Sequence, residues 1–194
     1  MEAMLYRILE ERFPKEVTVK DGKSYTLRPL LPMDRERLWD FFKDIPEEDR
    51  MFLKHDVSRE ETIITWCTHI DYEKVLPILA LDGDNVAADA TLHQDRGGWQ
   101  SHIGTVRIVV HPEHRRKGLA TALITELMEL AVFTGVDYLE AECLADQEPM
   151  LRFFERLGFN ETFRLPNRVR DRRMNYHDLV ILSYELRPEG FEAD

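Results

Sequence analysis

One stretch of the chain, residues 103–131, predicts a strand, a short turn and a long helix in immediate succession. Its first residues are mostly β-branched, as in a buried strand, and His111-Pro112 ends them because proline cannot donate to a strand ladder. The helix is marked by apolar residues at four-residue spacing, namely Leu119, Leu123, Leu127 and Ala131. Three cations and a glycine, Arg115–Gly118, lie between strand and helix. Backbone N–H groups and the positive end of the helix dipole converge on such a turn, which predicts a phosphate or pyrophosphate site.

The composition limits the classes of protein that this chain can belong to. Its 194 residues suffice for one domain with a small appendage, and 43% of them are hydrophobic without forming a membrane-length apolar run. A net charge of −11 argues against nucleic-acid binding over the general surface. Cys67 and Cys143 have neither disulfide-framework nor zinc-site spacing, so we expect reduced thiols and no metal. We therefore expect a cytoplasmic protein with neither nucleic-acid nor membrane partners.

The first half of the chain predicts a short helix over residues 2–12 and a hairpin whose two-residue turn is Asp21-Gly22. A helix follows Asp34, and Ser58–Glu61 has the pattern of a capping box that begins another. Two strands, Leu76–Leu81 and Val86–His93, then lead to the stretch described above.

After the long helix, Gly135 fits a C′ glycine and Val136–Leu144 predicts a strand. Asp146 is placed to cap a helix that starts near Pro149 and ends at Gly158. Two closing strands are expected at 160–165 and 178–186, joined by an arginine-rich connection. The fold class is α/β (α+β), with a mixed sheet flanked by helices. The expected divisions are an N-terminal helical extension (1–15), one domain (16–187) and a loose tail (188–194).

The turn motif and a second segment resemble a known family. Arg115-x-x-Gly118-x-Ala120 matches the Q/R-x-x-G-x-G/A signature of the GNAT superfamily of N-acetyltransferases, and residues 145–159 resemble that family's helix ending in L-G-F. The resemblance covers roughly residues 24–186. It implies a mostly antiparallel twisted sheet whose central strands splay apart around acetyl-CoA. Leu27–Leu30 and Glu142–Asp146 further resemble the bacterial protein-lysine acetyltransferase type.

The resemblance also implies which residues bind the donor. N–H groups of the turn and helix start would hold the pyrophosphate, and a side chain at Gly118 would fill that cradle. The strand backbone would polarise the thioester carbonyl. The side-chain amide of Gln147 and the ring of Phe154, both from the second segment, would contact the CoA arm. The expected binding residues are Ile108, Val109, Val110, Arg115, Arg116, Lys117, Gly118, Leu119, Ala120, Thr121, Gln147 and Phe154.

The catalytic base and acid depart from the family pattern. Family members often have a glutamate early in the strand where this chain has Thr105 and Arg107, so Glu142 is the first substitute. Glu140 projects to the same side of the strand. His102, His111 and a water chain are alternatives for the base. Phe154 stands where many members have the tyrosine near the CoA sulfur, which makes Tyr184, or else Tyr176, the candidate acid.

Two functional hypotheses follow. The first is an acetyl-CoA-dependent N-acetyltransferase that moves an acetyl group directly to a primary amine of a small molecule, a protein lysine or an N-terminus. An acidic chain suits a cationic acceptor. Five arginines (Arg164, Arg168, Arg170, Arg172 and Arg173) could instead line an entrance for an anionic one, or bind the phosphate end of CoA. The second is a catalytically weak acyl-CoA-binding regulatory module. No Lys-Ser or Lys-Thr follows the glycine, so a P-loop is not expected. An exposed final strand could pair in a homodimer.

Overall fold

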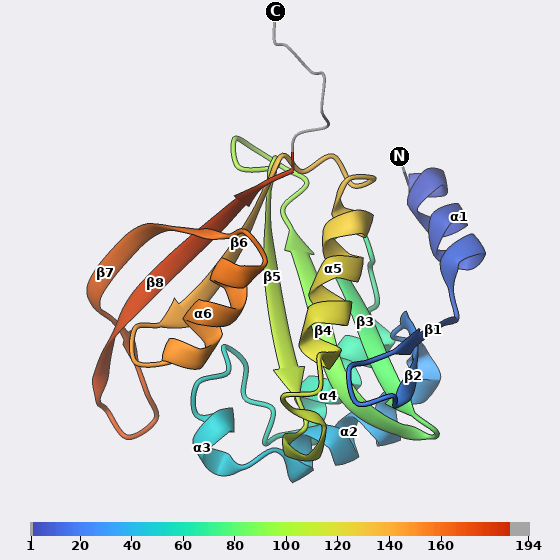
Figure 1. Cartoon of the computed structure of the whole chain (residues 1–194), viewed down its shortest axis with the longest axis horizontal. Helices are drawn as coiled ribbons and strands as arrows, with labels where there is room; N and C mark the ends of the chain where they lie inside the picture. Colours follow the sequence, from blue (N-terminus) through green and yellow to red (C-terminus); the bar gives the residue numbers. More distant parts are fainter. Residues whose placement is uncertain (1, 187–194) are drawn as a thin grey trace, which may run out of the picture.

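Eight strands form one sheet in the computed structural model, which describes residues 2–186, with side chains from Met4 onward. The order across the sheet is β1-β2-β3-β4-β5-β6-β8-β7, and of the described pairs only β5–β6 is parallel (Figure 1). The strands are β1 (Lys15–Thr18), β2 (Ser24–Pro29), β3 (Val75–Asp82), β4 (Asn85–Gln94), β5 (Ile103–Val110), β6 (Tyr138–Leu144), β7 (Asn160–Arg170) and β8 (Tyr176–Glu185).

Helices cover both faces of this sheet. Figure 1 shows α5 and α6 crossing the near face, with α2 and α4 on the far side. The helices are α1 (Glu2–Arg12), α2 (Arg35–Asp44), α3 (Glu47–Arg50), α4 (Glu60–Thr68), α5 (Leu119–Ala131) and α6 (Glu148–Arg156), with 3-10 turns η1 (Pro32–Asp34) and η2 (Pro112–His114). None of the described helices is long and apolar enough to cross a membrane. The mixed sheet and its flanking helices match the expected fold class.

The two central strands separate halfway along their length. β5 and β6 pair from Ile103↔Tyr138 to Val106↔Ala141 and no farther, so Arg107–Val110 has a strand partner only on the β4 side. β6 turns away from β5 toward its far end and continues beside β8 (Figure 1). The expected splay of the central strands is therefore present. Its open edge ends beside the turn that leads into α5.

Alternation along the strands gives the sheet one apolar face and one partly polar face. Even-numbered residues of β4 and β5 and odd-numbered residues of β6 pack with α5 in the main core, which includes Leu92, Val106, Leu123 and Leu139. A second core under α2 and α4 includes Phe42, Ile63 and Leu79. Beside that second core, the face that α5 does not cover carries polar side chains on β4 and on the splayed strands β5 and β6. We call this the polar face, and its members are Asp89, Thr91, His93, Thr105, Arg107, Glu140 and Glu142.

The N-terminal helix belongs to the same packed structure. Leu5 and Leu9 of α1 are buried in the main core. Arg12 and Lys15 both pair with Glu126 of α5, whose side chain is 3% exposed. The division of the chain into 1–15 and 16–187 stays a prediction, and the expected tail at 188–194 lies outside the described residues.

Several local predictions were wrong in detail. The hairpin of β1 and β2 has a longer loop than two residues, since Thr18 pairs with Ser24. Ser58 caps no helix, because its hydroxyl donates to Asp56 while α4 starts after Arg59. Gly135 is not a C′ glycine, since α5 ends at Ala131 and a turn intervenes.

Two further details differ near the C-terminal half of the sheet. Gln147, not Asp146, is the N-cap residue of α6, and Asp146 contacts His177 instead. The expected arginine-rich connection is mostly strand, because β7 runs to Arg170 and forms a long hairpin with β8. These positions depend on partners distant in sequence, which local patterns do not specify.

Candidate active site

The turn between β5 and α5 presents a row of unused hydrogen-bond donors. Within the described chain, the backbone N–H groups from Arg116 to Thr121 donate to no protein acceptor. Arg116 and Gly118 have positive φ angles of 61° and 95°, which fold the chain tightly into the helix start. The first-turn N–H groups of any helix lack internal partners and point along the positive end of the dipole. The turn can therefore accept an anion with several phosphate oxygens.

A neighbouring loop braces this turn from outside. The Lys20 N–H donates to the Lys117 carbonyl at 3.1 Å, and a Cβ built on Gly118 would lie 3.4 Å from Cγ of Lys20. A side chain at Gly118 would thus press on the β1–β2 loop, whereas the sequence pattern predicted that it would fill the phosphate cradle. The sequence pattern also gave no sign of Lys20, because nothing local links the β1–β2 loop to a turn almost a hundred residues later.

The first cation of the motif, Arg115, forms hydrogen bonds with other residues of the protein. Arg115 donates from Nε to the Val110 carbonyl at 3.0 Å and from Nη2 to Asp49 at 2.6 Å. It therefore joins the end of β5 to α3. Lys117 lies 3.8 Å from Asp21, and Arg116 is exposed. Backbone donors, more than free cationic side chains, define this part of the site.

The edges of the splay carry backbone groups aimed into the gap. His111 donates its N–H to Ala87 of β4, so by alternation the N–H and C=O groups of Val110 and Ile108 point the other way, toward β6. Val109 faces β4 with its backbone. On the opposite edge, the Gln147 side-chain oxygen accepts the Leu144 N–H at 3.1 Å. An extended ligand in the gap would meet Ile108 and Val110 as a strand meets its neighbour.

Glu142 lies at the mouth of the splay. It is the first β6 residue after the last paired position, Ala141, and its side chain is 25% exposed. Lys54, from the segment after α3, forms an ion pair with it. The segment that holds Lys54 also places His55 at 3.5 Å from Arg107 and Asp56 at 2.6 Å from Arg172. This segment, residues 51–56, covers the splay from the polar face.

Burial shifts the pKa of the titratable groups on and beside this face in the direction that favours their neutral forms. Burial and the positive charge of Arg107 lower the pKa of His93 to about 3, and its Nε2 lies 2.9 Å from the Thr91 hydroxyl. Burial also lowers the pKa of His55, with Arg107 and Lys54 adding to the effect. Burial raises the pKa of Glu140, and the neighbouring Glu142 raises it further.

Asp89 is a buried carboxyl that the sequence pattern did not single out. It lies on β4 opposite Val109 and is 8% exposed, and its Oδ1 is buried without a hydrogen-bond partner among the described residues. Burial raises the pKa of Asp89 to about 7. Between the ordinary aspartate pKa and 7, the folded protein binds a proton that the unfolded chain lacks, so stability falls as pH rises through that window.

Asp89→Asn is therefore expected to gain stability over the wild type as pH rises. The difference in unfolding free energy between variant and wild type should grow by roughly 2–3 kcal/mol from pH 5 to pH 8. Urea denaturation at the two pH values measures it. Asp84→Asn, at a side chain that is 91% exposed, is the matched control and should show no such change. A pH-independent difference for Asp89→Asn would contradict the raised pKa.

Four of the remaining sequence candidates contact other parts of the protein or solvent. Tyr184 pairs with Leu139, beside the joined part of β5 and β6, and its ring packs on Gly158 and Phe159. Phe154 is 3% exposed within the main core. His102 packs on Tyr138 at the opposite end of β5. Tyr176 is 61% exposed at the start of β8. This placement does not bring either tyrosine to Glu142, and their roles stay predictions.

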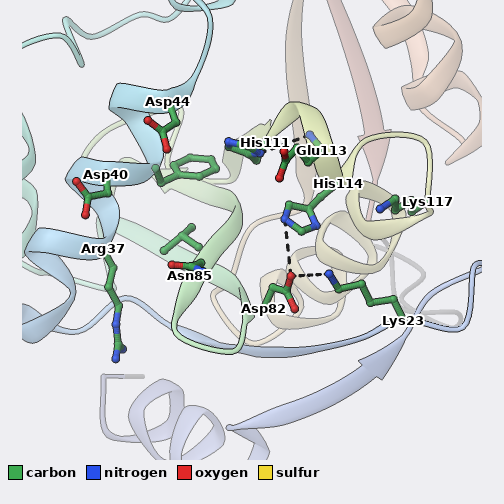
Figure 2. Close-up of a pocket in the computed structure, with 12 residues that line it drawn as sticks. Lys23, Arg37, Asp40, Asp44, Asp82, Asn85, His111, Glu113, His114 and Lys117 are labelled. Atoms are coloured by element: carbon green, nitrogen blue, oxygen red, sulfur yellow. Dashed lines mark hydrogen bonds and ion pairs between the residues drawn. The ribbon is translucent and has the colours of Figure 1, made fainter.

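A cavity of about 420 Å³ lies beside the turn between β5 and α5. It is enclosed by α2, η2 and the β3–β4 turn. Figure 2 shows Lys23 and His114 both directed at Asp82, with Lys117 at one rim. Its lining has four acids against three lysines and arginines, which does not suit a polyanion. Ligand atoms of His111, Glu113 and His114 lie within 4.8 Å of one another there. The expectation of no metal site stays a prediction.

The comparisons with known proteins decide the family. Residues 35–159 match the acetyltransferase (GNAT) family model. The chain belongs to the GNAT acetyltransferase family. This is the family that the sequence motifs predicted, and its members use acetyl-CoA.

Individual relatives agree with this assignment. The chain is 26% identical over 163 residues to Acetyltransferase Pat of Mycolicibacterium smegmatis, a match that covers 79% of this chain and 48% of that protein. It thus spans about half the length of this curated relative. The GNAT domain of S. lividans PAT has a TM-score of 0.73 at 20% identity, covering 88% of this chain and 96% of that one. A putative acetyltransferase from Salmonella typhimurium, solved with its cofactor acetyl-CoA, has a TM-score of 0.72 at 16% identity over 88% and 99% of the two chains.

Proposed function

We propose that this chain transfers the acetyl group of acetyl-CoA directly to a primary amine at the splay between β5 and β6. The observation that supports this most strongly is the position of the unused N–H donors, Arg116–Thr121, directly after the strand whose edge is open. The donors would take the pyrophosphate of CoA, and the pantetheine arm would lie along the backbone edge of Ile108 and Val110. The thioester then faces the polar face of the sheet.

The chemistry requires a polarised carbonyl and a neutral amine. A backbone N–H of β5, that of Ile108 or Val110, is positioned by strand geometry to donate to the thioester oxygen, where charge develops during attack. Glu142, at the mouth of the splay, is the proposed acceptor of the amine proton, after the incoming amine displaces Lys54. Tyr184 packs beside the joined strands, so we propose no side chain as the acid for the leaving thiolate.

The acceptor has two candidate classes, a small amine and a protein lysine. The resemblance of Leu27–Leu30 and Glu142–Asp146 to the bacterial protein-lysine acetyltransferase type favours the protein lysine. The charges of the polar face favour a small amine of a particular kind, which is developed below. A homodimer, and the absence of nucleic-acid and membrane partners, stay predictions of the sequence.

Titration of the purified protein with acetyl-CoA in a calorimeter tests the donor site. One saturable site per chain is expected, and desulfo-CoA should compete for it because it keeps the pyrophosphate and most of the pantetheine arm. A parallel assay of CoA thiol release over a panel of primary amines tests catalysis. Binding without turnover on any amine would favour the regulatory module over the enzyme. The absence of saturable binding would contradict the proposed donor site.

A further inference from the structure

The polar face contains one guanidinium that forms no ion pair with any described carboxylate. Arg107 of β5 is half-buried, and its Nε is buried without a hydrogen-bond partner among the residues that the structure describes. Its one polar contact is the His55 ring, 3.5 Å from Nη1, and no described carboxylate forms an ion pair with it. A buried guanidinium without a counter-charge is costly, so a ligand that supplies an anion there would be stabilised.

Arg107 and Glu142 face the same space from opposite edges of the splay. Thr105 is aligned with Glu140 where the strands still pair, so the residues two positions later, Arg107 and Glu142, extend to the same face after the strands part. Glu142 acts on Arg107 through its charge, yet its close partner is the ammonium of Lys54. The gap thus has a guanidinium on one side and, on the other, a carboxylate that already holds an ammonium.

Resting on the proposed acetyl transfer, we infer that the acceptor is a small amine that also carries a carboxylate. Its ammonium takes the place of the Lys54 ammonium on Glu142, and its carboxylate binds the guanidinium of Arg107. The planar fork of arginine suits a carboxylate because two parallel N–H groups can donate to its two oxygens. Lys54 comes from the 51–56 segment and is 43% exposed, so it can turn outward into solvent when the acceptor enters.

The transfer itself balances with these groups. The acceptor ammonium gives one proton to Glu142, and the resulting amine nitrogen attacks the thioester carbonyl. A C–N bond forms, the C–S bond breaks, and CoA leaves as the thiolate. The amide nitrogen loses its second proton to solvent, which also protonates the thiolate. Arg107 takes no part in these bonds and acts as a specificity residue.

Cationic side chains that would also favour an anionic ligand line a cavity next to the splay. A cavity of about 410 Å³ lies between the 51–56 segment and the tip of the β7–β8 hairpin, with Lys54, Arg170 and Arg172 in its lining. Arg172 pairs with Asp56, and Asp171 is occupied by Asn175 and His177. Within the described chain Arg170 has no ion pair. The lining of this cavity therefore holds three cations against the two carboxylates of Asp56 and Asp171, on a chain whose net charge is −11.

Matched acceptors test the inference directly. Two sets of amino acids are used, the ω-amino acids from glycine to 6-aminohexanoate and the common α-amino acids. Each is compared with its own carboxamide in the CoA-release assay. The wild type is expected to prefer the best carboxylate acceptor over its carboxamide by about 10- to 100-fold in kcat/KM. Arg107→Met should abolish that preference, and Arg107→Lys should restore part of it. Arg152→Met, an exposed arginine of α6, is the matched control and should keep the preference.

The possible outcomes separate this inference from the proposed function. Equal rates for acids and amides in the wild type, or a preference that survives Arg107→Met, would overturn the inference. So would turnover confined to a lysine peptide without a carboxylate near the amine. Acetyl-CoA binding with no acetylation of any carboxylate amine would overturn it while leaving the donor site intact. Failure of the wild type to bind acetyl-CoA would instead contradict the proposed function.

Discussion

Gly118→Val is expected to lower the affinity for acetyl-CoA by at least about 100-fold. Gly118 has a φ of 95°, which a β-branched residue avoids, and a new Cβ would lie 3.4 Å from Cγ of Lys20. The turn would relax by changing its backbone angles, and the N–H groups from Arg116 to Thr121 would no longer converge. Since each hydrogen bond to a charged oxygen is worth about 1.5–3 kcal/mol, loss of two of them already exceeds 100-fold. Calorimetric titration with acetyl-CoA measures the effect.

Gly98→Val is the matched control, because it introduces the same backbone strain at a position outside the proposed site. Gly98 has a similar φ of 90°, but a Cβ at this position would have no other atom within 4 Å, and the residue lies in the loop between β4 and β5. This variant should lose some stability and bind acetyl-CoA as the wild type does. Thermal melting of both variants checks that each is folded. Wild-type affinity in folded Gly118→Val would show that the turn does not hold the donor.

Asp34→Ala is expected to destabilise the fold by about 3–5 kcal/mol. Asp34 is fully buried and accepts hydrogen bonds from both terminal nitrogens of Arg28 at 2.6 Å and from the Leu31 N–H at 2.8 Å. Removal of the carboxylate leaves the guanidinium of Arg28, 16% exposed, without its counter-charge. Urea denaturation measures the loss. Asp40→Ala removes a carboxylate that is 66% exposed and pairs with Lys43 alone, so it should change stability by less than about 0.5 kcal/mol.

The same pair predicts a pH dependence. Burial alone would raise the pKa of Asp34, but the hydrogen bonds from Arg28 and Leu31 outweigh it and lower the pKa. A carboxyl with a lowered folded-state pKa stabilises the protein above the ordinary aspartate pKa, and that contribution is lost as pH falls toward the folded value. The difference between wild type and Asp34→Ala should therefore be constant near neutrality and shrink in acid. A difference that grew on acidification would contradict the assigned pKa direction.

The sequence alone determined the donor half of the site. The strand, the turn and the helix over residues 103–131 are adjacent in the chain, and their apolar spacing and glycine act locally, so their order and conformation follow from the pattern. Because these features are local, the motif of the GNAT family could be recognised in the sequence. Three errors concern residues suited to a helix cap. Ser58 binds the nearby Asp56, Asp146 contacts the distant His177, and α5 ends before Gly135 is reached.

The acceptor half was decided only by the tertiary structure. Arg107, Glu142 and Lys54 come from β5, β6 and the segment after α3, and nothing in their spacing shows that they share one space. Their meeting depends on strand register, on the point where β5 and β6 part, and on the path of the 51–56 segment across the gap. Asp89 was missed for the same reason, because a carboxyl in a strand becomes unusual only when folding buries it without a partner. The sequence thus predicted the donor side of the proposed site, and the three-dimensional arrangement supplied the charges from which the class of acceptor is inferred.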